Sequence, residues 1–339
     1  MSKIDYNYKE VELKNIINRN RKALFGFAAL LIYAFHGWKA VFSDVPGLFE
    51  IENAIRKYGD VGVDIFLFLS GMGLVNSWKN CSSYKVFITR RFRRVLVPSV
   101  IASIVFVIVN LDDPMHAIKA ITGFYYFTGR LNMYLWFGFT IVLLYLCFPF
   151  YYERFRKAKS QFLFTAAVIL LWLIYIFLLK GHVNDWSYIC LDRIPIFLIG
   201  IYAYHFVHAH EKLNPVLLYG VSGIMLTAGY CLAVRIKEGG LSLLLPHSYA
   251  LLPYTMMAIS LIILLSKLFT YIPHRILDFY GLFTFEFYCV QERIFQLLED
   301  TFDSMPVIVD NLIVLAIATV CAYAVYLINI SVRERIKEK

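Results

Sequence analysis

The chain has little charge and no paired-cysteine motif. Only 17% of its 339 residues are charged, whereas 60% are hydrophobic, well above the roughly 45–50% apolar content of soluble domains. Its six cysteines form no CxxC pair and mostly lie in apolar runs, so neither a disulfide framework nor a zinc site is expected. The alternation of apolar and polar residues that marks transmembrane β-barrels is also missing. These absences exclude a soluble enzyme and a small disulfide-stapled domain.

Long hydrophobic runs dominate instead. They measure about 16 to 24 residues, the length of helix that crosses a hydrocarbon layer ~30 Å thick. The sequence therefore predicts an all-α polytopic membrane protein, a bundle of about ten transmembrane helices. The predicted spans cover residues 23–42, 61–78, 95–110, 133–152, 161–180, 188–206, 215–234, 247–269, 279–298 and 307–330.

Lysine and arginine are unevenly distributed between alternate loops. Most of them fall in the N-terminal segment, in the alternate loops from 79–94 onward and in the final segment, and basic residues are retained on the cytoplasmic side. We therefore expect a cytoplasmic segment 1–22, a membrane domain 23–330 and a cytoplasmic tail 331–339, in the plasma (inner) membrane. The first hydrophobic run is too long for a signal-peptide core, so it should remain in the mature protein.

The net charge of +9 does not call for nucleic acid as a partner. Basic loops that face anionic lipid headgroups account for a charge of this size and sign. The loops on the opposite side are short, and no soluble catalytic domain is apparent. Any chemistry is therefore expected within the helix bundle.

His36 and Asp64 are ionisable residues inside the first two predicted spans. Each lies about 14 residues from the inner end of its span, or ~21 Å along a helix, so both reach the same depth in the outer half of the membrane. Neighbouring antiparallel helices can pair imidazole with carboxylate at that depth. Two alternatives remain open: His36 is an interfacial histidine, and Asp64 stabilises the start of its helix.

Four arginines gather at the start of the third span, in the stretch "RRFRRVLVP". On a helix, Arg91 and Arg94 share one face at a spacing of i, i+3. Their planar guanidinium groups suit phosphate oxygens, so this face, with help from Arg90, is a candidate site for a nucleotide-like donor. The alternative is that these arginines only fix the topology.

Other polar residues interrupt the later spans. Asp192 and Arg193 begin span 6 and can neutralise one another, while Glu286 lies inside span 9. Such charges cannot all face lipid, so an internal polar network is expected, either as structural support or as part of a site. Trp136 stands near the outer interface, where an aromatic-belt role is the alternative.

In this order, the early motifs resemble those of the acyltransferase family 3 membrane proteins, which O-acylate carbohydrates and related acceptors. The family shows a histidine near the outer end of helix 1, matched by His36. It then shows a "VDxFFxxSGxxL" helix, matched by "VDIFLFLSGMGL", which contains Asp64 and Ser70. A basic segment leads into helix 3, matched by "RRFRRVLVP" with Arg91 and Arg94.

Later motifs extend the resemblance over almost the whole chain. "YLWF" around Trp136 is similar to the family's Leu-Trp segment, "RIPIFLIGIY" from Arg193 to its Arg-x-Pro helix, and "TFEFYCVQ", with Glu286 and Tyr288, to its "SxExYLxH" segment. Two positions depart from the pattern. The first helix lacks the usual Asp-x-x-Arg start, and Gln291 stands where the family has a late histidine.

The resemblance implies a membrane O-acyltransferase that moves an acyl group, most simply acetyl from acetyl-CoA, to a hydroxyl of a cell-envelope glycan or glycan precursor. Arg91 and Arg94, with Arg90, would bind the donor phosphates. His36 would activate the acceptor hydroxyl or carry the acyl group, oriented by Asp64. Ser70, Trp136, Arg193, Glu286 and Tyr288 would bind substrate or support the site.

These roles imply no metal and no permanently bound cofactor, because acyl-CoA is a substrate. The arginines and His36 lie about 20 Å apart in depth, so we expect a channel that admits the pantetheine arm. The acceptor would be a membrane-borne glycan or lipid-linked saccharide, and a separate protein would complete any transfer outside the membrane. A transporter or flippase for a glycan or lipid-linked saccharide is the alternative, and a non-catalytic assembly or sensing subunit is a third.

Overall fold

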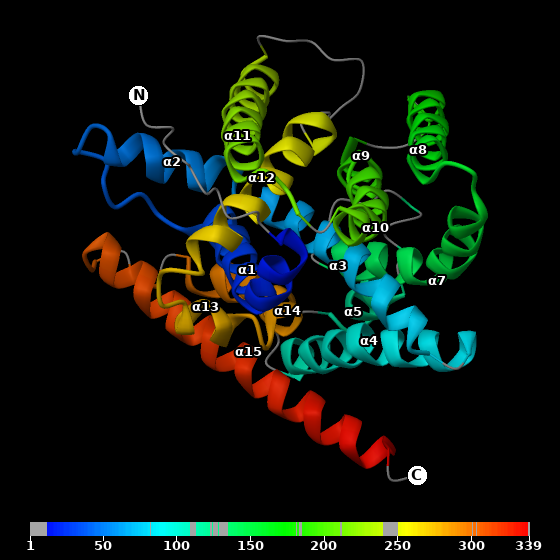
Figure 1. The fold of residues 1–339 in the computed structure, drawn as a ribbon. Helices are drawn as coiled ribbons and strands as arrows, with labels where there is room; N and C mark the ends of the chain where they lie inside the picture. The colour runs from blue at the N-terminus through cyan, green and yellow to red at the C-terminus, as the bar shows by residue number, and fades with distance from the viewer. Residues whose placement is uncertain are drawn as a thin grey trace, which may run out of the picture.

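The computed structural model describes residues 12–81, 83–108, 113–122, 124, 128, 135–180, 182, 185–210, 212–239, 250–299, 301–302 and 304–337. Its regular elements in these ranges are helices (Figure 1). They are α1 (Leu13–Gly37), α2 (Leu48–Tyr58), α3 (Val61–Lys79), α4 (Tyr84–Ile108), α5 (Pro114–Ile121), α7 (Trp136–Lys157), α8 (Gln161–Leu178), α9 (Asp185–Leu191), α10 (Ile194–Ala209), α11 (Pro215–Lys237), α12 (Leu252–Leu268), α13 (Arg275–Tyr280), α14 (Thr284–Leu298) and α15 (Val307–Lys337).

These helices confirm an all-α polytopic membrane protein. Among the described residues, six helical segments are long and apolar enough to cross a membrane: α3, α7, α8, Tyr188–Ala209 including α10, α11 and α15. The shorter helix α12 is also apolar. The remaining predicted spans correspond to α1, α4 and α14, which carry the charged residues of interest.

Two of these helices extend further than their hydrophobic runs. Helix α1 begins at Leu13 and α4 at Tyr84, well before the expected starts of spans 1 and 3. Hydropathy detects only the part of a helix that faces lipid or the apolar core, whereas the backbone hydrogen bonds continue into amphipathic turns. The arginines of α4 therefore lie on a regular helix and not in a loop.

Helix α3 forms the core of the bundle with α1, α10 and α12. Its residues from Val61 to Leu69 are all buried. Helices α3 and α10 approach closely because each has glycine at the contact. A Cβ atom at Gly71 would lie 2.3 Å from the carbonyl oxygen of Phe197, and one at Gly200 would lie 2.2 Å from that of Phe68. The "SG" motif of α3 thus has a packing role.

Helices α8, α11 and α15 form parts of the periphery, and Figure 1 shows α8 and α15 at the edges of the molecule around a central α1. Large apolar side chains on them are exposed, including Leu171 on α8, Ile224 on α11 and Val320 on α15. Exposed apolar surface of this extent is unfavourable in water and favourable against lipid chains. These helices are therefore expected to contact the bilayer.

Candidate functional site

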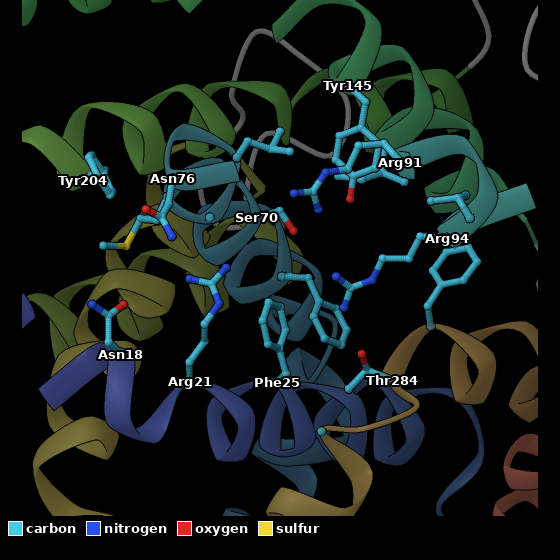
Figure 2. Close-up of a pocket in the computed structure, with 18 of the residues that line it drawn as sticks. Asn18, Arg21, Phe25, Ser70, Asn76, Arg91, Arg94, Tyr145, Tyr204 and Thr284 are labelled. Atoms are coloured by element: carbon cyan, nitrogen blue, oxygen red, sulfur yellow. The ribbon is translucent and has the colours of Figure 1, made fainter. Parts of the chain in front are cut away.

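A cavity of about 630 Å³ opens between the N-terminal halves of α1 and α4, the C-terminal parts of α3 and α10, and parts of α7 and α14. We call it the arginine cavity. Arg21, Arg91 and Arg94 line it together with Lys14, and none of its described lining residues is acidic. Figure 2 shows the three guanidinium groups directed into the same space. The cavity is thus positively charged and suited to a polyanion.

Arg21 is held in this cavity by α3. Its Nη2 donates a hydrogen bond to the carbonyl oxygen of Leu69 at 2.5 Å, and its guanidinium group lies 5.2 Å from the ring centroid of Phe25. A Cβ atom at Gly73 would lie 2.3 Å from Nη2 of Arg21. Glycine at this position therefore leaves the room in which the guanidinium group reaches α3.

Arg91 and Arg94 enter from α4, at the spacing that the sequence indicates. The Arg91 guanidinium group packs 5.6 Å from the ring of Phe87 and 5.7 Å from that of Tyr145, contacts that restrict its orientation. Arg94 is exposed to the cavity. Arg90 is exposed and does not line the cavity, because it lies on another face of the helix.

Hydroxyl groups also line the arginine cavity. Ser70 of α3 and Thr284 of α14 are labelled beside the arginines in Figure 2. Tyr288, one turn further along α14, lines the same cavity, and its hydroxyl accepts a hydrogen bond from the backbone N–H of Phe137 at 3.2 Å. The serine and tyrosine singled out by motif thus lie with Arg91 and Arg94.

His36 lies elsewhere, in a second cavity of about 450 Å³ at the C-terminal ends of α1 and α14. We call this the polar cavity. Its charged lining residues are His36, Lys39, Arg56, Lys57, Glu292, Glu299 and Asp310. His36 is exposed to this cavity, and its Nδ1 lies 3.3 Å from Nε2 of Gln291. The imidazole therefore faces a polar space.

The expected pairing of His36 with Asp64 is wrong. Asp64 is fully buried and accepts a hydrogen bond from Nη1 of Arg193 at 2.7 Å, while Nη2 of Arg193 bonds Asp60 at 2.8 Å. Asp60 also accepts a hydrogen bond from the hydroxyl of Tyr254 at 2.6 Å. Asp64 faces α10 and not α1, so it belongs to an ionic network that joins α3, α10 and α12. Arg193 thus bonds Asp60 and Asp64, and its charge also acts on the neighbouring Asp192.

Glu286 and Trp136 flank the cavities. Glu286 accepts a hydrogen bond from Nδ2 of Asn329 at 2.7 Å, which links α14 to α15. The Trp136 ring lies 6.0 Å from the guanidinium group of Arg193 and packs edge-on against Phe137. Both residues contact parts of the protein that position the site, and neither lines either cavity.

Among the residues that the structure describes, the continuous channel expected between the arginines and His36 is not formed. The two cavities share no described lining residue. Phe66, Phe137 and Tyr288 line the arginine cavity together: the ring centroids of Phe66 and Phe137 lie 6.0 Å apart, and those of Phe137 and Tyr288 5.5 Å apart. On α14, about one turn separates Tyr288, which lines the arginine cavity, from Glu292, which lines the polar cavity. We call the layer formed by these three rings the aromatic partition.

Two residues of these cavities were not predicted from the sequence. Arg21 was assigned to a cytoplasmic segment, although Lys14, Asn18, Arg21 and Phe25 repeat at the spacing of one helix face and all line the arginine cavity. Extending the helical periodicity upstream of the hydrophobic run reveals that face. Glu292 matches none of the motifs that indicate site residues. Within the described residues, no group of three or more His, Cys, Asp or Glu side chains is arranged to hold a metal ion.

Comparison with known proteins identifies one matching family model. A model described as an acyltransferase domain matches residues 24–328, nearly the whole chain. The match covers all of the motifs on which the resemblance was based, the whole lining of the polar cavity, and the lining of the arginine cavity except Lys14, Asn18 and Arg21. Neither the curated proteins nor the solved structures include a significant match to the chain.

Proposed function

The chain belongs to this acyltransferase family, and from that premise we propose that it transfers an acyl group, most simply acetyl, from acyl-CoA to a hydroxyl of a cell-envelope glycan or glycan precursor. One observation carries the choice of donor. Three arginines from α1 and α4 converge in a cavity whose described lining contains no acidic residue. Such a site favours the phosphates of coenzyme A.

Arg21, Arg91 and Arg94 hold the donor in this proposal. Arg21 and Arg91 are oriented by the Leu69 carbonyl and by Tyr145, so less side-chain freedom is lost when phosphate binds. Arg90 is left out because it does not line the cavity. Ser70 and Thr284 line the same cavity as the arginines and Tyr288. Their hydroxyl groups can donate hydrogen bonds to the pantetheine arm.

His36 acts on the acceptor in the polar cavity. The oxygen of the acceptor hydroxyl attacks the thioester carbonyl carbon, a C–O bond forms and the C–S bond breaks. The hydroxyl proton passes to His36 and then to the leaving thiolate, which departs as free coenzyme A. The thioester reaches His36 only when the aromatic partition opens around Tyr288, so donor binding is coupled to a movement of that layer.

The test uses protein purified in lipid nanodiscs with labelled acetyl-CoA and a glycolipid extract of the source membranes as acceptor. Wild type is expected to release coenzyme A and label the extract, and His36→Ala to do neither. Arg94→Ala is expected to raise the KM for acetyl-CoA. Arg93→Ala is the matched control, because Arg93 is an exposed arginine of the same helix outside the cavity. An unchanged donor KM in Arg94→Ala would contradict the phosphate role.

A glycan or lipid-linked saccharide transporter is the second candidate. The arginine cavity and the polar cavity, separated by the aromatic partition, also suit a transporter that opens to one side of the membrane at a time. In the same preparation, movement of labelled glycan across vesicles without consumption of acetyl-CoA would favour transport over acyl transfer.

A further inference from the structure

The polar cavity holds three carboxylates, and they differ in their partners. Asp310 forms an ion pair with Lys39 at 2.8 Å. Glu299 is exposed at the end of α14, beyond Leu298. Glu292 is half-buried and makes no hydrogen bond or ion pair with the described part of the chain. An uncompensated carboxylate inside a membrane protein is costly, which makes Glu292 a candidate for function.

Glu292 is also the carboxylate that acts most directly on His36. The two residues line the same cavity; burial has the largest effect on the imidazole, and Glu292 is the charged group that acts on it most strongly. Asp60 has a smaller influence, and its carboxylate oxygens are already bonded to Arg193 and Tyr254. Asp64 is bonded to Arg193. Glu292 on α14, and not Asp64 on α3, is therefore the carboxylate that we assign to His36.

We propose that Glu292 is the positioning carboxylate of His36 in acceptor activation. This inference rests on the proposed function and assigns the acceptor to the polar cavity. As the hydroxyl proton moves to His36, the ring becomes an imidazolium, and the carboxylate of Glu292 stabilises that positive charge. The proton then leaves with the thiolate of coenzyme A, so no proton is transferred to Glu292.

The neighbouring residue on α14 fixes the orientation of the ring. Gln291 is buried and meets Nδ1 of His36 at 3.3 Å. A carboxamide can present either its oxygen or its nitrogen to a ring nitrogen. In the structure the amide nitrogen of Gln291 faces Nδ1, and its amide oxygen has no hydrogen-bond partner among the described residues. A half-turn of the amide places the oxygen against a protonated Nδ1 and leaves Nε2 as the base. Consecutive residues of one helix turn thus supply the orientation and the charge that a histidine base requires.

The charges around His36 decide how activity depends on pH. Those that line its cavity or influence it are Lys39, Arg56, Lys57, Asp60, Glu292, Glu299 and Asp310. Lys39 is paired with Asp310, and Lys57 with Glu238 at 3.1 Å. Removing Glu292 therefore makes the surroundings of His36 more positive, which disfavours the positively charged imidazolium form. Neutral imidazole, the active form, then persists to lower pH.

The experiment measures the pH profile of kcat/KM with acetyl-CoA and the glycolipid extract in nanodiscs. Glu292→Gln is expected to lower the plateau by about tenfold or more and to move the acid limb by about one unit towards lower pH. Glu292→Asp, which keeps the charge, should recover part of the rate and return the limb towards its wild-type position.

Glu299→Gln is the matched control, because it removes an equal charge from the same helix and cavity. Its acid limb is expected to coincide with that of wild type. A Glu292→Gln profile that matches wild type, while His36→Ala is inactive, overturns this inference and leaves the proposed function standing. Equal shifts of the acid limb in Glu292→Gln and Glu299→Gln also overturn it. The loss of any negative charge from the cavity would then explain the change in pH dependence. A wild type that consumes no acetyl-CoA overturns both.

Discussion

The guanidinium group of Arg21 joins two helices at the arginine cavity. It lies on α1 and is bonded to the Leu69 carbonyl of α3, in space left by Gly73. The carbonyl occupies one nitrogen of the planar fork, and the other N–H groups remain available to an anion. If the donor binds here as proposed, Arg21 couples its binding to the packing of the helices that carry Ser70 and His36.

Replacement of Arg21 tests this assignment. Arg21→Ala is expected to raise the KM for acetyl-CoA about ten- to a hundredfold, because a charge-assisted hydrogen bond to phosphate contributes about 1.5–3 kcal/mol. Arg21→Lys keeps the charge but loses the fork, so an intermediate KM is expected. Initial-rate kinetics at saturating acceptor provide the measurement.

Arg19→Ala serves as the control, because Arg19 is exposed on the same helix and lies outside the cavity. Its donor KM should equal that of wild type. Equal effects of the two alanine variants would show that only the overall positive charge of the segment matters.

Glu52 on α2 fixes the segment that follows His36. Its carboxylate accepts hydrogen bonds from the indole N–H of Trp38 at 2.8 Å and from the backbone N–H groups of Val41 and Phe42 at 2.9 Å. Burial alone favours the neutral acid, but these hydrogen bonds outweigh it and lower the pKa of Glu52. The ionised carboxylate thus holds the edge of the polar cavity in place.

A lowered pKa makes this contribution dependent on pH. It is fully present above the unfolded pKa of about 4.3 and is lost as the pH falls through the lower folded value. Glu52→Gln is therefore expected to lower the melting temperature at pH 7, with a gap to wild type that narrows below about pH 4. Thermal unfolding followed by intrinsic fluorescence measures the gap. Asp44→Asn, which changes an exposed carboxylate outside this arrangement, should show no such trend.

At the scale of the helices, the pair α3 and α10 depends on close contact and on a buried ionic network. Glycines at 71 and 200 bring the backbones together, and Arg193 bonds both Asp60 and Asp64. Removing one member of a buried ion pair leaves an uncompensated charge and costs about 3–5 kcal/mol. The network therefore determines whether the central helices pack correctly.

Two substitutions separate a structural role of Asp64 from a catalytic one. Arg193→Met leaves Asp64 without its cation and Asp60 with only Lys237, at 3.6 Å, so it should reduce the yield of folded protein more than Asp64→Asn does. Asp64→Asn is expected to lower the melting temperature while keeping most of the turnover per folded molecule. Size-exclusion yield, melting temperature and turnover give the comparison. A stable but inactive Asp64→Asn protein would indicate that Asp64 has a catalytic role.

The motifs predicted which helices form the site better than which side chains meet. Residue counting gave His36 and Asp64 the same depth, but depth along a helix says nothing about which neighbour a side chain faces, and Asp64 turns to α10. The i, i+3 pair Arg91 and Arg94 was predictable because both residues share one helix. Arg21 was missed because its amphipathic turn has too little hydrophobicity to mark a span.

At the scale of the whole molecule, the distribution of basic residues predicts on which side each cavity opens. The loop between α3 and α4 contains Cys81, which is partly exposed, on the side predicted to be cytoplasmic. In a variant that keeps only this cysteine, a membrane-impermeant maleimide is expected to react from the cytoplasmic side alone. Asp44→Cys in the corresponding cysteine-free protein should react only from the opposite side. Labelling of Cys81 from outside intact cells would reverse the predicted orientation.

The aromatic partition also bears on electrical insulation. With the chain oriented as predicted, the two cavities would open to opposite faces of the membrane, and the aromatic partition would be the barrier between them. Most of the transmembrane voltage then falls across the rings of Phe66, Phe137 and Tyr288, and not across the full bilayer. A small residue in place of Tyr288 would therefore be expected to make cells leaky to protons or ions.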